Sequence, residues 1–205
     1  IMSHTQMNTD LPDQELVDAF LPPCDIPHRL VHEKPVTIGG LAWPQETLSM
    51  RVETDEAFQR VPEVYEEHRK AFKEIFGRDP GGAITPFETD DAEVILIASG
   101  TIASTTRDVV RRRRKQGEKV GMIKVKTFRH FPGAELVEAC RNAEKVGVLD
   151  RNYSAGTGGV FWQEFRATAQ GRRDDLLIQD YLTGVCGGDV IPDMIDEVID
   201  DLRGR

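Results

Sequence analysis

The sequence predicts an α/β fold with a mostly parallel, doubly wound sheet, preceded by an extended connector and a long helix. Three observations support this expectation. Six of the eleven prolines lie between residues 11 and 50, a stretch with apolar residues at helical spacing follows, and short apolar runs then alternate with amphipathic segments. Strands and helices that alternate with short connections require crossovers, so the strands are expected to run parallel.

The first part, residues 1–50, is expected to be a connector and the end of a preceding domain. Proline removes a backbone donor and restricts the residue before it, so we expect no long regular element here apart from a short helix at 13–20. The chain opens on Ile1 rather than on methionine, and we expect it to be a segment of a longer polypeptide.

The second part, residues 51–87, is expected to hold one long helix and a linker. Apolar side chains recur at helical spacing between residues 54 and 76. Thr54 is placed to cap the start of this helix, and Gly77 is placed to end it.

The third part, residues 88–205, is expected to form the α/β domain. Short apolar runs bounded by turn-forming residues predict buried strands, and the segments between them have the apolar spacing of helices. The expected strands are 92–98, 119–126, 145–149 and 176–181, and the expected helices are 102–114, 133–143, 160–168 and 192–202.

Composition limits the partners and the compartment. A formal net charge of −9 and an isoelectric point near 5.1 argue against nucleic acid or an anionic membrane surface as a partner, because both need a basic face. No apolar run approaches the ~20 residues that span a bilayer. Cys24, Cys140 and Cys186 are far apart in sequence, so neither a disulfide framework nor a zinc or iron–sulfur site is expected. We expect a cytoplasmic protein.

The most distinctive segment follows the third expected strand, where an apolar run leads into a polar tip and three glycines. Carboxylate, guanidinium and amide groups lie together there, and glycine permits positive φ angles and a close backbone approach. A subunit contact, an anion- or ligand-binding loop and a plain loop all fit this pattern, and a subunit contact is favoured. The residues of this candidate interface loop are Asp150, Arg151, Asn152, Ser154, Gly156, Gly158 and Gly159.

A second glycine-rich loop follows the last expected strand, so both loops are expected at the same edge of the sheet. Cys186 lies within this loop and has no basic neighbour in sequence that would favour its thiolate, so we expect a small packed residue rather than a reactive one. The candidate contact residues of the second loop are Gly184, Gly187, Gly188 and Asp189.

Three weaker patterns have ordinary structural interpretations. Ser99-Gly100-Thr101 follows a strand as a phosphate loop would, but one glycine and no lysine predict a tight turn. The basic run 111–115 ends a helix, where cations complement the helix dipole, and predicts a solvated face or a subunit salt-bridge surface. His130 has no carboxylate or nucleophile near it in sequence, so a packed, interface-facing turn is expected rather than a catalytic base.

Several segments carry a family resemblance: Asp90–Gly100, Gly117–Pro132 and Val148–Gly159, with Ser3–Thr5 and Leu11–Pro22. Together they resemble the alpha subunit of the 2-oxoacid:ferredoxin oxidoreductases, the pyruvate:ferredoxin oxidoreductase-like family. The two amino-terminal segments look like the join between that subunit's first and second domains. The resemblance covers nearly the whole chain.

The resemblance implies that residues 88–205 have the fold of the transketolase carboxyl-terminal domain. It also implies a role in an enzyme that uses thiamine diphosphate, magnesium and iron–sulfur clusters to decarboxylate a 2-oxoacid oxidatively, typically to an acyl-CoA and CO2. Electrons pass to ferredoxin or another acceptor. The family's cofactor, substrate and cluster contacts lie in other domains or subunits. We therefore expect a structural, assembly domain with no catalytic, cofactor-binding or metal-binding residue, whose partners are those other domains or subunits.

Two other hypotheses stay open at this point. In the first hypothesis, the chain is a stand-alone regulatory α/β module that binds an anion or a nucleotide through the loop 150–159. In the second hypothesis, it is the equivalent domain of a lipoamide-linked 2-oxoacid dehydrogenase, which resembles this family in fold but passes its acyl group to lipoamide.

Overall fold

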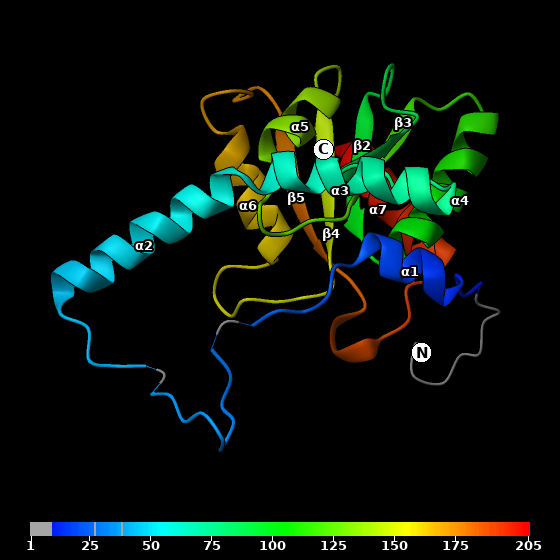
Figure 1. Cartoon of the computed structure of the whole chain (residues 1–205). Coiled ribbons are helices and arrows are strands. Elements are labelled where there is room, and N and C mark those ends of the chain that lie inside the picture. The colour runs from blue at the N-terminus through cyan, green and yellow to red at the C-terminus, as the bar shows by residue number, and fades with distance from the viewer. Residues whose placement is uncertain (1–9, 27, 38) are drawn as a thin grey trace. The chain divides into compact units, whose positions relative to one another are not determined.

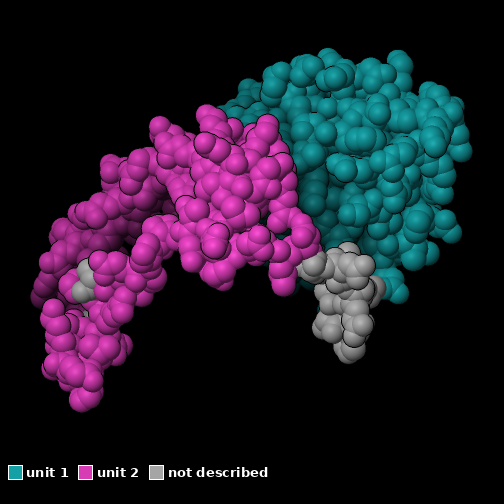
Figure 2. Space-filling model, turned by 45° about the vertical axis from the view of Figure 1, so that its right-hand side comes forward, with its two compact units in different colours: residues 1, 81–205 teal, residues 2–80 magenta. Residues whose placement is uncertain are grey.

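The computed structural model describes residues 10–26, 28–37 and 39–205. The chain divides into two compact units, Met2–Pro80 and Gly81–Arg205, which Figure 2 shows in separate colours. None of the helices in the described ranges combines the length and the apolar character that crossing a bilayer requires.

The described part of the first unit contains three helices, α1 Gln14–Phe20, α2 Pro44–Gln59 and α3 Val61–Phe76 (Figure 1). The short α1 agrees with the helix expected at 13–20. In place of one helix at 54–76, the structure has two helices that meet at Arg60. Gly77 ends α3 as predicted, with a left-handed φ of 68°.

Local chemistry explains the two helices. Pro44 starts α2 because the first turn is where a helix tolerates a missing N–H group. Thr54 does not cap a helix, since its hydroxyl donates to the Met50 carbonyl at 2.7 Å inside α2. Pro62 occupies the first turn of α3 and has no N–H, so the hydrogen-bond ladder of α2 cannot continue unbroken through it.

The end of α1 packs against α3 through aromatic rings. The Phe20 ring lies edge-on to Phe72 and Phe76, with centroid separations of 5.5 and 5.6 Å, and 6.3 Å from the His68 ring. α1 therefore covers the carboxyl-terminal part of the apolar face of α3.

The second unit is built on a five-stranded sheet in the order β1-β3-β2-β4-β5. The four later strands pair in parallel, as expected, and β1 pairs antiparallel with β3 at one edge. The sequence pattern does not predict β1 because Pro86 interrupts it, although edge strands tolerate proline. The strands are β1 Ile84–Phe87, β2 Val94–Ser99, β3 Val120–Val125, β4 Lys145–Asp150 and β5 Leu177–Leu182.

Helices cover both faces of this sheet (Figure 1). α4 and α7 share one core with Leu96 of β2, and α5 and α6 share the other core with Ile97. Strand β2 is buried on both faces, which explains its continuous apolar run. The doubly wound α/β fold is thus confirmed. The helices are α4 Ile102–Lys115, α5 Gly133–Ala139, α6 Val160–Ala169 and α7 Pro192–Gly204.

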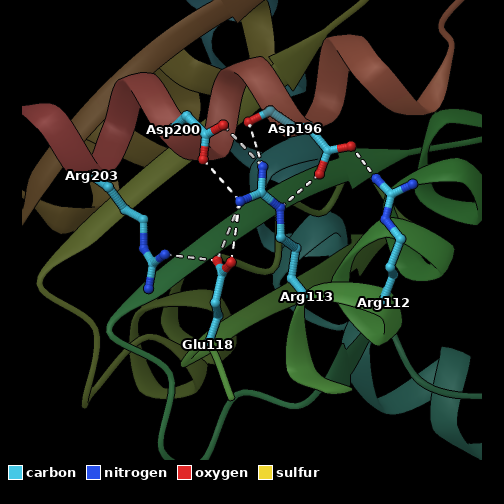
Figure 3. A network of polar contacts seen from close by, with 6 residues as sticks. All are labelled: Arg112, Arg113, Glu118, Asp196, Asp200 and Arg203. Atoms are coloured by element: carbon cyan, nitrogen blue, oxygen red, sulfur yellow. Dashed lines mark hydrogen bonds and ion pairs between the residues drawn. The ribbon is translucent and has the colours of Figure 1, made fainter. Parts of the chain in front are cut away.

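Arg112 and Arg113 in the basic run at the end of α4 pair with α7, which corrects the expectation of a solvated or subunit-facing surface for these two residues. Arg111 and Lys115 are exposed, as expected of a solvated face. The Arg113 side chain is only 14% exposed and pairs with Asp196 at 2.7 Å, with Asp200 at 2.9 Å and with Glu118 at 3.2 Å. Two further arginines share these carboxylates, so the charges balance within the chain. Figure 3 shows the whole network, which consists of Arg112, Arg113, Arg203, Glu118, Asp196 and Asp200.

Candidate functional site

The first glycine-rich loop closes the amino end of α6. A helix leaves its first four N–H groups without intrahelical partners, which here are those of residues 159–162. Asp180 accepts a hydrogen bond from the first at 2.9 Å, and Asn152 from the second at 3.0 Å. The two carboxylate oxygens of Asp150 accept from the third and fourth at 3.2 and 3.0 Å. The positive end of the helix dipole is thus occupied by the chain's own acceptors.

Two of the loop's glycines make room for these carboxylates. A Cβ atom on Gly159 would collide with the carboxylate of Asp150. Gly158 has a φ of 88°, and a Cβ atom there would lie 2.5 Å from Oδ2 of Asp180. The close approach of the backbone to the two acids therefore requires glycine at both positions.

The tip of this loop is a tight turn. Ser154 and Gly158 exchange two backbone hydrogen bonds of 2.8 and 3.0 Å, and Gly156 between them has a φ of 85°. Tyr153, at the start of the turn, is 56% exposed. The tip therefore presents an aromatic ring, small side chains and backbone groups to the surface.

Asp150 is the buried charge of the site, with 0% of the residue exposed. Burial raises the pKa of its carboxyl group, hydrogen bonds from the amides of Trp162 and Phe161 lower it in part, and the neighbouring Asp180 raises it. Asp150 was expected among the contact residues of the loop, but its side chain serves α6 and does not reach the surface.

Arg151 ties the two glycine-rich loops together. Its Nε donates to the carbonyl of Gly184 at 3.2 Å, and its Nη2 donates to the carbonyl of Gly188 at 3.0 Å. Its Nη1 donates to the hydroxyl of Thr101 at 3.4 Å. The guanidinium thus links the ends of β4 and β5 with the start of α4, and both loops leave the same edge of the sheet (Figure 1).

The second loop contains a single 3-10 turn, η2 Val185–Gly187. Cys186 in this turn has a left-handed φ of 58° and an exposed side chain. The expectation that Cys186 is a small packed residue is therefore wrong. Gly184 and Gly187 on either side also have positive φ, and the turn they form holds Cys186 away from the core. Asp189 beyond the turn is exposed as well.

The other sequence patterns have the local structures expected of them. Gly100 forms a tight turn with a φ of 60°, directly before α4. His130 is half-buried in a turn beside Phe128, whose ring lies 5.0 Å from that of Phe161. Contact of this turn with a partner stays a prediction. Burial raises the pKa of the Cys140 thiol to about 12, which disfavours its reactive thiolate form.

Residues 92–195 match the family model of pyruvate:ferredoxin oxidoreductase core domain II. The chain belongs to this family. It is 35% identical over 199 residues to pyruvate synthase subunit PorA of Methanothermobacter thermautotrophicus, and the alignment covers 97% of this chain and 51% of that protein. It is 32% identical over 204 residues to ketoisovalerate oxidoreductase subunit VorA of Pyrococcus abyssi, and the alignment covers 99% of this chain and 52% of that protein. The chain therefore spans about half the length of these relatives.

A solved 2-oxoglutarate:ferredoxin oxidoreductase from Magnetococcus marinus is 19% identical, and the alignment covers 67% of this chain and 23% of that one. The TM-score of this alignment is 0.47. The match to core domain II does include both glycine-rich loops and strands β2 to β5, whereas α1, α2, α3 and β1 lie outside it.

Two residues of the site, Asp180 and Thr101, are not predicted from the sequence as partners of the glycine-rich loops. Asp180 lies inside an expected strand, where aspartate is unfavourable, and this conflict is a signal that it has a specific partner. Thr101 carries no such signal, because a threonine at the start of a helix is ordinary.

Proposed function

We propose that this chain is a non-catalytic structural domain of a 2-oxoacid:ferredoxin oxidoreductase that depends on thiamine diphosphate and iron–sulfur clusters. The match to core domain II supports this proposal, as do relatives named as subunits of pyruvate synthase and ketoisovalerate oxidoreductase. The whole enzyme decarboxylates a 2-oxoacid oxidatively, typically to an acyl-CoA and CO2. It passes electrons to ferredoxin or another acceptor and works in the cytoplasm.

The observation that carries the structural role is the commitment of the polar groups at the carboxyl edge. A catalytic acid or base must face its substrate. Asp150, Asn152 and Asp180 instead bind the amino end of α6. Arg151 binds backbone carbonyls of the second loop. These side chains hold the edge in shape and leave the reacting groups to other parts of the enzyme.

The capped amino end of α6 does not fit the diphosphate cofactor that the family implies. The free amides of a helix amino end can hold a diphosphate, but in α6 two carboxylates occupy them and would repel an anion. Within the described ranges, His, Cys, Asp and Glu side chains are nowhere grouped in threes so as to hold a metal ion. Thiamine diphosphate, magnesium and the clusters therefore belong, in this proposal, to other domains or subunits.

The two glycine-rich loops are the proposed contact with those subunits. Apolar side chains lie exposed around them: Tyr153 is 56% exposed, Val185 38% and Ile191 50%. Exposed apolar groups of this kind are typical of protein interfaces. Because Arg151 already links the loops, little ordering free energy is needed when a partner binds.

A tag on this chain in its native host tests the proposal. We expect the tagged chain to elute as a brown complex with iron and a subunit that holds thiamine diphosphate, and to reduce a viologen dye when a 2-oxoacid is added. A colourless chain that elutes alone would refute the proposal. An iron-free complex that transfers the acyl group to lipoamide would identify a lipoamide-linked dehydrogenase instead.

A substitution at the loops separates assembly from chemistry. Arg151→Ala should weaken subunit association while the turnover of each assembled complex is unchanged. Arg141→Ala is the matched control, because Arg141 is also an exposed arginine and its ion pairs with Glu138 and Asp90 lie away from the loops. Normal assembly with lost turnover in Arg151→Ala would place the loop in the chemistry.

The stand-alone binding module is tested by calorimetric titration of the chain with phosphate, ATP and coenzyme A. We expect no saturable heat, because the amides at the amino end of α6 are already bound. Saturable binding would favour a regulatory module.

A further inference from the structure

We propose that α2 and α3 form a docking seam for a basic amphipathic helix of a partner polypeptide. The seam lies in the unit Met2–Pro80, outside the residues that match core domain II. The residues of the seam follow one another at alternating spacings of four and three residues, which is the heptad pattern of helix pairing. The residues of the seam are Met50, Thr54, Ala57, Val61, Val64 and His68.

The seam continues from one helix into the next. Arg60, where α2 and α3 meet, keeps right-handed helical angles of −86° and −12°, so the stripe is not broken at the junction. Two hollows of about 550 and 430 Å³ lie along it, and Ala57 and Val61 line both. The two hollows therefore adjoin and form one shallow, open groove along the two helices.

The apolar groups of the groove are exposed. Neither α2 nor α3 has a buried residue among those described. Met50 is 57% exposed, Phe58 41% and Val64 47%. Exposed apolar side chains along a helix offer a surface onto which an amphipathic helix can pack.

The chain itself shows that a helix fits this stripe. α1 packs on the carboxyl-terminal part of α3, where Phe20 contacts Phe72, Phe76 and His68. His68 is also the last residue of the open seam. The groove thus continues directly from an existing helix contact, and its remaining length matches a partner helix of about five turns, or about 27 Å.

Charge selects the kind of helix. Residues 44–68 carry seven carboxylates against two arginines, Arg51 and Arg60. At 3.6 residues per turn, five of these carboxylates lie on one side of the seam with Arg60, whereas Arg51 lies on the other side. A second copy would bring its own acidic side to this surface, whereas lysine and arginine along one flank of a partner's apolar stripe would complement the acidic side. The acidic residues are Glu46, Glu53, Asp55, Glu56, Glu63, Glu66 and Glu67.

Peptide titration against this chain tests the seam and does not depend on the proposed function. One synthetic helix has leucine in the heptad core positions and lysine on both flanks, and a matched helix has glutamate on the flanks. By fluorescence anisotropy the lysine peptide should bind about tenfold more tightly or better. Equal binding, no saturation, or self-association of the chain seen by sedimentation would overturn the proposal.

Two charge-matched variants locate the site. Ala57→Glu places a carboxylate in the groove, and Gln59→Glu places one on the opposite side of α2, because two residues turn a helix by about 200°. Both positions are exposed helix positions, so both variants should fold. Ala57→Glu should weaken binding of the lysine peptide about tenfold and Gln59→Glu less than twofold. Equal effects would contradict the assignment.

Photo-crosslinking identifies the occupant in the native assembly. A benzophenone amino acid replaces Phe58, which lines the groove. We expect it to crosslink to a lysine- or arginine-rich helical segment of a different polypeptide. Crosslinks to a second copy, to another part of this chain, or to an acidic or non-helical segment would overturn the proposal, and so would the absence of any crosslink.

Discussion

Replacing Arg113 with methionine tests whether the ion network between α4 and α7 stabilises the α/β unit. Methionine keeps an unbranched side chain of similar helix propensity, so the effect of the change is the loss of the charge and its hydrogen bonds. The Arg113 side chain is 14% exposed, and the side chains of Glu118, Asp196 and Asp200 are 17%, 21% and 62% exposed. Two of the three carboxylates would therefore lose a partner in a mostly buried position.

The magnitude follows from what those carboxylates retain. Removing one partner of a buried ion pair costs about 3–5 kcal/mol, because an uncompensated charge stays behind. Asp196 keeps Arg112, and Glu118 keeps Arg203 at 2.7 Å. Water solvates the more exposed Asp200. We therefore expect Arg113→Met to lower the free energy of unfolding by about 2–3 kcal/mol, less than a full buried pair.

Urea denaturation followed by circular dichroism measures this loss. The matched control is Arg111→Met in the same helix, because the Arg111 side chain is 53% exposed and pairs with Asp108, which is 74% exposed. The control should lose less than about 1 kcal/mol, the range of an exposed ion pair. If Arg113→Met loses no more than the control, the network does not stabilise the unit and the reasoning is refuted.

In urea denaturation, Gly159→Ala should lower the free energy of unfolding by about 2–3 kcal/mol, because the new Cβ atom would collide with the Asp150 carboxylate. Gly156→Ala should lower it by only about 1 kcal/mol, because there is open space around a Cβ atom at that position. Burial raises the pKa of Asp150 above 3.8, so its protonated form is more favoured in the folded state than in the unfolded state. The free energy of unfolding of the wild type relative to that of Asp150→Asn should therefore fall as the pH rises above about 4. A difference between the two proteins that does not change with pH would contradict this. In Arg151→Ala, the Gly188 amide should exchange hydrogen faster, while amides of β4 should not change.

The sheet core is predictable from sequence because burial leaves a pattern in the residues themselves. β2 has neighbours on both sides and helices on both faces, so its run of apolar residues marks it within one or two residues of its ends. β1 has one neighbour, half-buried side chains and Pro86, and such an edge strand leaves no comparable pattern. The sequence pattern does not reveal the helix junction at Arg60, because the apolar spacing continues from α2 into α3 without a break.

The positions of the two loops are predictable, but the tasks of their side chains are not. A strand followed by glycines indicates where a loop leaves the sheet, whereas hydrogen-bond partners depend on backbone groups distant in sequence. Arg151 binds a carbonyl 37 residues away, and Asp180 binds an amide 21 residues away. The pattern around Asp150 therefore suggested an exposed contact, where folding creates a buried helix cap.

The capped amino end of α6 links this fold to its proposed role. A glycine-rich loop that leads from a parallel strand into a helix offers free amides, which in many α/β proteins hold a phosphate. Here Asp150 and Asp180 supply the negative charge themselves, so the helix end is satisfied before any ligand arrives. The amino end of α6 is consequently closed to anions, while apolar groups of the two loops remain exposed. An edge with these properties suits contact with a protein surface better than binding of a small anionic ligand.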